Sequence, residues 1–159
     1  MKRLWIGFTV VMVLSFLVLG WIGTRIYQEM PPIPDRVVTA DGAVVVPEGA
    51  IGRGQNVWQS MGGMQVGSVW GHGSYLAPDW TADWLHRECV FILDRWSSEL
   101  SGRHFLYLSA DEQAVLRSRL SRMMRTNTFR TSDGVLVIDP VRAAAFSSNA
   151  SHYSLIFSE

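Results

Sequence analysis

Cysteine is nearly absent from this chain of 159 residues, in which Cys89 is the only one. A single cysteine excludes an internal disulfide framework, a c-type haem held by two thioether bonds, and an all-cysteine metal site within one chain. We interpret Cys89 as a small, buried, apolar residue, because free cysteine is among the most buried residue types.

An excess of either charge is also absent. Lysine plus arginine number 14, as do aspartate plus glutamate, so the formal net charge is zero. Without a basic surplus to attract phosphates, we expect no nucleic-acid partner. None of the four histidines lies beside another histidine, a cysteine or an acid at the spacing of metal ligands, so we predict no metal site. A lysine-bearing phosphate loop is missing too, which argues against a nucleotide site.

Apolar residues, in contrast, concentrate at the amino terminus. Residues 4–23 carry no charge, and about 20 helical residues span the roughly 30 Å core of a bilayer. The run is longer than the apolar region of a signal peptide, and no A-x-A-like cleavage site follows it. We therefore predict an uncleaved transmembrane anchor over residues 1–27 rather than a signal peptide. Lys2 and Arg3 favour a cytoplasmic amino terminus, with the rest of the chain outside the cytoplasmic membrane.

The rest of the sequence predicts a proline-rich linker over residues 28–36 and a domain over residues 37–159. Asp41-Gly42 and Asp133-Gly134 each separate two β-branched runs, which is typical of a tight hairpin. Between and after the hairpins, apolar periodicity and capping signals predict mostly helix. The expected helices cover residues 50–61, 81–100, 109–124 and a last stretch beginning at Pro140.

Two of these helices have a clear apolar face. The helix over 50–61 is predicted to be amphipathic, with Ile51, Val57, Trp58 and Met61 on one face. The helix over 109–124 opens with a Ser109–Glu112 capping box and is predicted to bury Leu116, Leu120 and Met123, with its arginines in solvent. The residues alone thus indicate an anchored, mainly α domain with two small hairpins and no catalytic apparatus of its own.

One run identifies a family. Residues 54–88, GQNVWQSMGGMQVGSVWGHGSYLAPDWTADWLHRE, closely resemble the amino-terminal region of quinol-dependent nitric oxide reductases, and the resemblance extends over essentially the whole chain. In that family a membrane anchor and a periplasmic cytochrome c-like domain are joined to a transmembrane bundle, which carries haem b and a non-haem iron. The resemblance implies a mainly α chain in which one transmembrane helix precedes a cytochrome c-like helical domain with two hairpins.

The related cytochrome c-dependent enzyme has a small subunit in which C-x-x-C-H precedes a loop of the form G-x-G-x-Y-x-A-P. This chain keeps Gly71, Gly73, Tyr75, Ala77 and Pro78 of that loop. Where the pattern has its two cysteines and its histidine, this chain has Gly63, Val66 and Gly67. A c-type haem needs those sulfurs and that imidazole, so the resemblance implies a haem-like loop without haem, and no cofactor in this chain.

A haem-sized void would cost more stability than a domain can spare, so aromatic side chains are expected to fill it. The expected fillers are Trp58, Met64, Trp70, Tyr75, Trp80 and Trp84. The resemblance then implies a non-catalytic cap on the catalytic bundle, with membrane quinol as the electron donor of the enzyme. Trp70, His72 and Tyr75 are the candidates for contact with the bundle, because they lie in the stretch most like the family.

The sequence stops at Glu159, before the membrane bundle of the family. A fragment, a truncated gene product and a separate subunit are all compatible with this, and in each case we expect no catalytic residue here. Two other functions stay open: a single-pass anchored binding or sensor module whose tryptophan-rich loop holds a small ligand, and a non-functional remnant.

Overall fold

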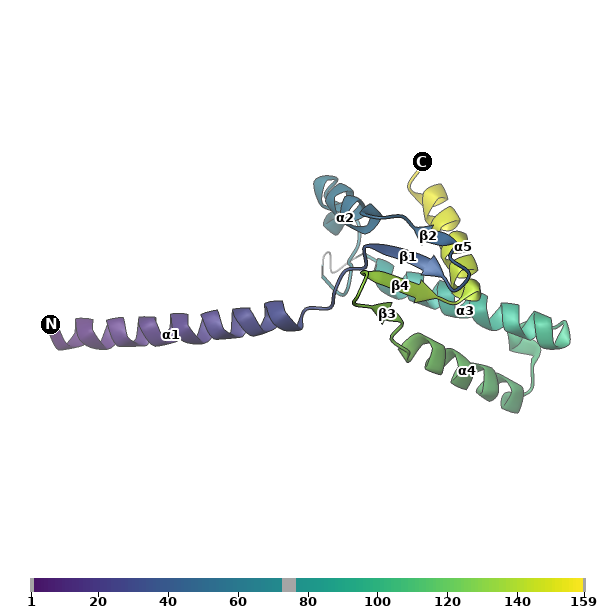
Figure 1. Cartoon of the computed structure of the whole chain (residues 1–159), viewed down its shortest axis with the longest axis horizontal. Helices are drawn as coiled ribbons and strands as arrows, with labels where there is room; N and C mark the ends of the chain where they lie inside the picture. Colours follow the sequence, from purple (N-terminus) through teal and green to yellow (C-terminus); the bar gives the residue numbers. More distant parts are fainter. Residues whose placement is uncertain (1, 73–76, 159) are drawn as a thin grey trace. The chain divides into compact units, whose positions relative to one another are not determined.

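The computed structural model describes residues 2–72 and 77–158, and it divides the chain into two compact units, Met1–Ile33 and Pro34–Glu159. The first unit contains helix α1 (Lys2–Glu29), which has the length and apolar composition to cross a bilayer (Figure 1). None of its side chains is buried by the rest of the chain. The hydroxyl of Thr24 donates to the carbonyl of Gly20, so this polar group is satisfied within the helix.

The second unit is mainly α, as the sequence predicted. Its helices are α2 (Ala50–Ser60), α3 (Trp80–Ser101), α4 (Ala110–Arg125) and α5 (Pro140–Ile156), with short 3₁₀ turns η1 (Gly63–Gln65) and η2 (Phe105–Tyr107). Its strands are β1 (Arg36–Thr39), β2 (Val44–Val46), β3 (Phe129–Arg130) and β4 (Val135–Ile138). Both expected hairpins are present, β1 with β2 and β3 with β4.

The two hairpins join into one four-stranded sheet of order β2-β1-β4-β3, which the sequence did not predict. The central pair, β1 and β4, is parallel, with Val37 opposite Leu136. Val37 and Val135 are buried on this pair. The amide of Asp35 also donates to the carbonyl of Gly134 at 2.8 Å, which ties the start of the domain to the turn of the second hairpin.

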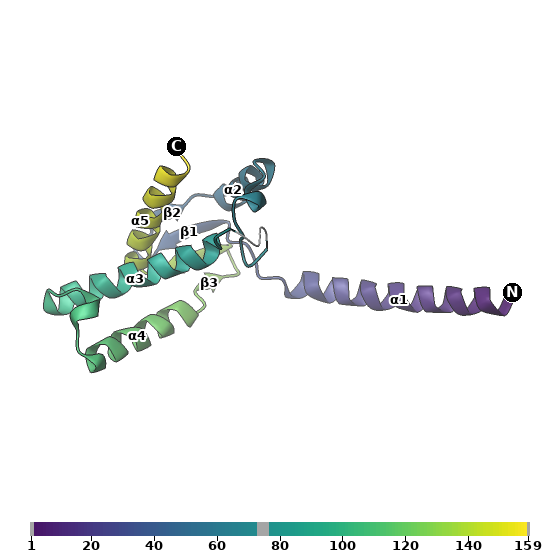
Figure 2. The same ribbon diagram turned by 180° about the vertical axis from the view of Figure 1, so that it is seen from behind.

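Helix α3 organises the core. It lies behind the sheet in Figure 1 and in front of it in Figure 2, and it packs against both α4 and α5. The buried cluster consists of residues from α3, η2, α4 and α5, together with Leu108: Ile92, Leu93, Trp96, Phe105, Leu108, Leu116, Leu120 and Ala145. The expected inner face of α4 is therefore confirmed. Its arginines are exposed, but Arg119 lies over the Trp96 ring, 4.0 Å from its centroid, and so covers the core as well.

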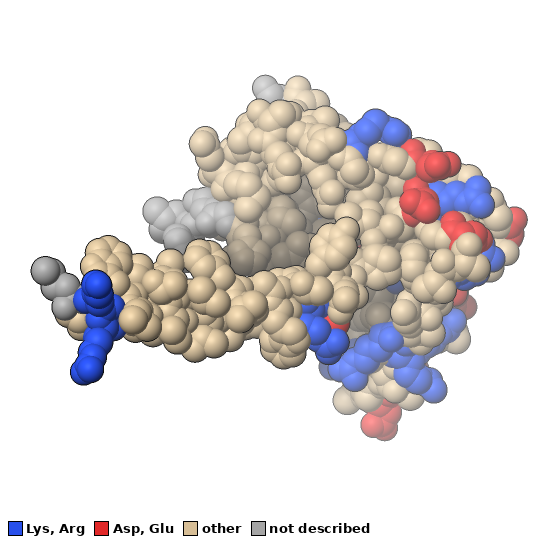
Figure 3. Space-filling model, turned by 60° about the vertical axis from the view of Figure 1, so that its left-hand side comes forward, with Lys and Arg blue, Asp and Glu red and all other residues tan. Residues whose placement is uncertain are grey.

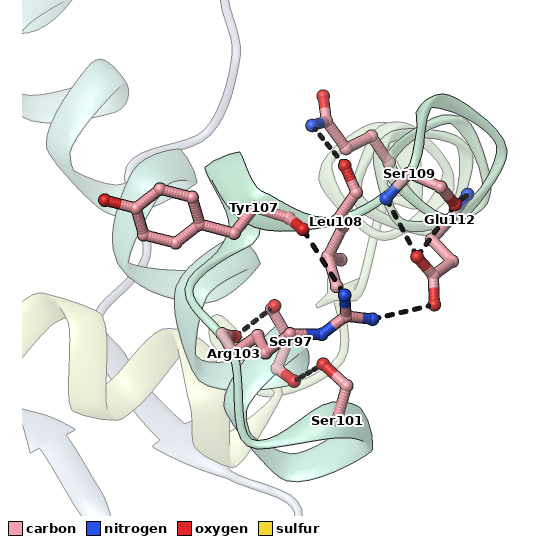
Figure 4. Close-up of polar contacts among 8 residues, drawn as sticks. Ser97, Ser101, Arg103, Tyr107, Leu108, Ser109 and Glu112 are labelled. Carbon is pink, nitrogen blue, oxygen red and sulfur yellow. Dashed lines mark hydrogen bonds and ion pairs between the residues drawn. The ribbon is translucent and has the colours of Figure 1, made fainter.

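A compact polar network fixes the connection between α3 and α4 (Figure 4). The predicted capping box is present, with the backbone amide and the hydroxyl of Ser109 both donating to Glu112 at 2.8 and 2.7 Å. Arg103 reaches the carbonyl of Tyr107 and the carboxylate of Glu112, each at 3.5 Å. Caps of this kind satisfy backbone groups that the helix itself cannot, so the turn into α4 is well defined.

Three polar contacts of long sequence separation join α3 to α5. The buried Glu88 accepts from Arg142 at 2.7 Å, and the hydroxyl of Tyr153 donates to Asp83 at 2.6 Å. The side-chain amide of Asn149 donates to the carbonyl of Trp84 at 3.0 Å. Burial, and then the bond to Asp83, raise the pKa of Tyr153 to about 12, so the phenol stays protonated at neutral pH.

The apolar face of α2 is not part of the core. This helix has no buried residue, and Val57 and Met61 on its predicted apolar face are 54% and 76% exposed. Of the four apolar residues predicted to share that face, only Ile51 and Trp58 are partly covered. The apolar periodicity correctly identified a helix with one apolar face, but that face is largely open within this chain.

Candidate functional site

The glycine-rich segment after α2 is a folded loop. Gly62 adopts a left-handed conformation with φ 68°, and η1 follows it directly. Further on, the amide of each of Val69 and His72 donates to the carbonyl of the other at 3.0 Å, so Trp70 and Gly71 form the two-residue tip of a small hairpin. Both have positive φ, 55° and 73°, as a type I′ turn requires. A tryptophan in that conformation is strained, and the surrounding hydrogen bonds hold it there.

Asp79 holds this loop against α3, a role that the sequence did not reveal. Its carboxylate accepts from the hydroxyl of Ser68 and the amide of Gly71, both at 2.8 Å. It also caps α3 by accepting from the amide of Ala82 at 2.9 Å. These bonds, led by the one from Ala82, lower the pKa of Asp79 below its ordinary value of 3.8. An aspartate two residues before the predicted helix was the available signal for the cap, but nothing local indicated the bonds to Ser68 and Gly71.

We expect Asp79→Ala to lower the melting temperature of the domain at neutral pH, because the change removes the cap of α3 and two bonds to the loop. Because the pKa of Asp79 is lower in the folded protein, its ionised carboxylate stabilises the fold at pH values above the unfolded-state pKa. This stabilisation is lost as the pH falls through the folded-state pKa. The difference in melting temperature between the wild type and Asp79→Ala should therefore be largest above about pH 5 and shrink below pH 3.8. Thermal melts at several pH values test this, and a difference that does not change with pH would contradict it.

Two of the three positions that the resemblance aligns with haem attachment have no room for a side chain. A Cβ atom built on Gly63 would overlap the indole ring of Trp58, and one built on Gly67 would overlap the indole of Trp80. Both glycines are buried. Val66, the third position, is 54% exposed. The residues present therefore do not fit a covalently bound c-type haem, since the thiols, the imidazole and the space for them are all missing at these positions.

An aromatic cluster surrounds these glycines. Trp80 meets Tyr153 and Phe157 edge to face, with ring centroids 6.0 and 5.5 Å apart. Trp84 stacks on Tyr153 at 5.5 Å, and Trp58 meets Phe157 at 6.5 Å. The sequence did not lead us to expect Tyr153 and Phe157 in this cluster. Their spacing of four residues nevertheless places them on one side of a helix.

The expected fillers divide into three groups. Trp58, Trp80 and Trp84 belong to the cluster, and Met64 joins it through its sulfur, which accepts from the indole of Trp58 at 3.4 Å. Trp70 does not, because it is 75% exposed at the hairpin tip. Tyr75 lies outside the described residues, so its predicted place in the core and at the interface stays a prediction. Of the other interface candidates, Trp70 and His72 are both exposed on the loop.

An apolar pocket of about 500 Å³ opens beside the cluster. The pocket is lined by residues of α2 and η1 and by the single residues that follow α2, η1 and α5. These are Gly54, Val57, Trp58, Met61, Gly63, Val66 and Phe157. Gly63 and Val66 are two of the positions that the resemblance aligns with haem attachment, so this pocket lies beside them. None of the residues that line it is charged.

Two titratable side chains away from this pocket have shifted pKa values. Among residues 2–72 and 77–158, no three histidine, cysteine or acidic side chains are placed to hold one metal ion. Burial, as the largest cause, raises the pKa of the Cys89 thiol, which disfavours a reactive thiolate. The bond from Tyr153, and next that from Arg87, lower the pKa of Asp83, so this group acts as a structural anion between α3 and α5.

Comparison with protein families identifies a related domain. The family model of the NorB cytochrome c-like domain, a domain of nitric oxide reductase, matches residues 34–159. This range begins at the same residue as the second structural unit and covers all its helices and strands. No curated protein sequence matches the chain.

Proposed function

Because the chain belongs to the family of the nitric oxide reductase NorB cytochrome c-like domain, we propose that it is a membrane-anchored, haem-less cap of a quinol-dependent nitric oxide reductase. In this role α1 holds the chain in the cytoplasmic membrane, with its amino terminus in the cytoplasm. The domain covers the outer side of the catalytic membrane part and supplies no catalytic residue itself.

The observation that carries the proposal is the pair of tryptophans over the haem-attachment positions. Trp58 and Trp80 occupy the space that side chains at Gly63 and Gly67 would need. A domain without c-type haem offers no relay for electrons from a soluble cytochrome c, so its enzyme requires a donor that reaches the membrane part directly. Membrane quinol meets that requirement, which supports the quinol-dependent branch of the family.

The anchor and the loop support the remaining parts of the proposal. Lys2 and Arg3 precede the apolar helix, and such residues favour the cytoplasmic side. Trp70 and His72 are exposed at the tip of a hydrogen-bonded hairpin, where they can contact a partner without loss of core packing. We propose these two, with Tyr75, as part of the contact with the catalytic membrane part.

The test is purification of the full chain from its native membranes. We expect no haem-stained band at the position of this chain on a denaturing gel, while a c-type cytochrome from the same membranes stains on that gel. We also expect the chain to copurify with the nitric oxide reductase membrane part, identified by mass spectrometry. A covalent haem on this chain, or purification of the chain free of any reductase, would refute the proposal.

A further inference from the structure

The open apolar face of α2 has no function in the fold of this chain. Val57 and Met61 point away from the core, with 54% and 76% of their surface exposed. Across the pocket, Val66 and Phe157 are each 54% exposed. These four residues surround one hollow of about 500 Å³. The name α2–α5 face is used below for the four residues together with the hollow that they surround. Contiguous exposed apolar surface of this kind marks an interaction site in soluble domains.

Charge is missing from both segments that build this face. Residues 54–78 and 143–158 contain no lysine, arginine, aspartate or glutamate, although the whole chain has 14 basic and 14 acidic residues. Figure 3 shows the charged side chains of the domain gathered over one part of its surface, while a broad part of the same view carries none. The absence of charge extends over two segments far apart in the sequence that meet at Trp58 and Phe157.

This composition favours a protein partner over the bilayer surface. Segments that lie on membranes combine apolar residues with lysine and arginine, which meet anionic headgroups. The centres of protein interfaces are instead depleted of charge and enriched in methionine and aromatic residues. The α2–α5 face has Met61, Trp58 and Phe157 around the hollow and no basic residue.

We propose that the α2–α5 face docks onto an uncharged, apolar protein surface of the reductase outside residues 1–159, with one apolar side chain of that surface seated in the hollow. The inference rests on the proposed function, since the matched domain is one part of a nitric oxide reductase. The hollow thus receives a side chain of the partner, in addition to the contact proposed for the loop.

Photo-crosslinking in native membranes tests which surface lies against this face. The probe is p-benzoylphenylalanine in place of Met61, whose exposure makes the change compatible with folding. The matched control carries it in place of Leu106, which is 70% exposed in η2, in the connection between α3 and α4. That connection lies at the end of the domain away from α2 (Figures 1 and 2).

We expect the probe at position 61 to form an adduct with a reductase segment outside residues 1–159, in about tenfold higher yield than at position 106. An adduct with phospholipid would overturn the proposal in favour of the bilayer, and an adduct with a second copy of this chain would overturn it in favour of a homodimer. Equal yields at the two positions would also overturn it.

A charge placed on the face separates this inference from the proposed function. When residues 1–159 are produced as a polypeptide separate from the reductase membrane part, Met61→Asp should reduce copurification of that part about tenfold or more, because an unpaired carboxylate would be buried at the interface. Leu106→Asp should leave it unchanged. If the wild type copurifies with the reductase and Met61→Asp does so equally, the face is wrong and the proposed function stands. If the wild type does not copurify, the proposed function itself fails.

Discussion

Replacement of Arg142 by methionine is expected to lower the free energy of unfolding of the domain by about 3 kcal/mol. Arg142 donates to the carboxylate of Glu88 at 2.7 Å, and the side chain of Glu88 is only 7% exposed. Removal of the guanidinium leaves a buried carboxylate without its partner, which is much more costly than loss of the pair as a whole. Because the side chain of Arg142 is itself 26% exposed, we expect the lower end of the usual range. Urea unfolding of the full chain in detergent solution, followed by tryptophan fluorescence, measures the change.

The matched control is Arg95→Met on the same helix as Glu88. Arg95 also meets a glutamate, Glu99, at 2.7 Å, but both side chains are more than half exposed. Water hydrates either side chain when the other is removed, so the expected loss in the free energy of unfolding is below about 0.5 kcal/mol. Adding Glu88→Gln to Arg142→Met should recover part of the stability, because the amide is neutral. Equal losses for Arg142→Met and Arg95→Met would show that burial of the pair has no such consequence.

Local signals were sufficient to predict most of the helices. The Ser109–Glu112 capping box and the Asp139-Pro140 pair mark the starts of α4 and α5, because a cap is a contact between residues close in sequence. The two hairpins were predictable for the same reason, since Asp-Gly turns carry the geometry of a hairpin tip. The parallel pairing of β1 with β4 was not, because it joins strands about 100 residues apart and leaves no local pattern.

The same limit explains what was missed at the candidate site. Glu88 follows Asp83 and Arg87 on α3, and from the sequence it is one more charged residue on a solvated helix. Its burial depends on Arg142, which lies 54 residues further on. The outward direction of the apolar face of α2 was not predictable, because periodicity identifies an apolar face without specifying whether this chain or another protein covers it. The resemblance, in contrast, singled out Gly63 and Gly67, whose lack of space for a side chain no periodicity could indicate.

Gly67→Ala is expected to lower the free energy of unfolding by about 1–3 kcal/mol. The added methyl group would overlap the indole nitrogen of Trp80, and Trp80 cannot move freely because Tyr153 and Phe157 pack against it at 6.0 and 5.5 Å. Gly67 has no positive φ, so the penalty comes from packing rather than from the backbone. Gly52→Ala is the control, since its Cβ would meet nothing within 4 Å and should stabilise α2 by up to about 1 kcal/mol. Urea unfolding of the two variants measures both changes.

A double-mutant cycle with Trp80→Ala tests the cause of the penalty. If the indole is the obstacle, Gly67→Ala should cost little in the Trp80→Ala background, and the coupling between the two changes should exceed about 1 kcal/mol.

The same crowding applies to haem, because Gly63→Cys, Val66→Cys and Gly67→His together would restore the attachment pattern without restoring the space. That triple variant, produced in cells that mature c-type cytochromes, should show no covalent haem on a denaturing gel. If haem became attached while Trp58 and Trp80 were still present, the two indole rings would not be what prevents haem attachment.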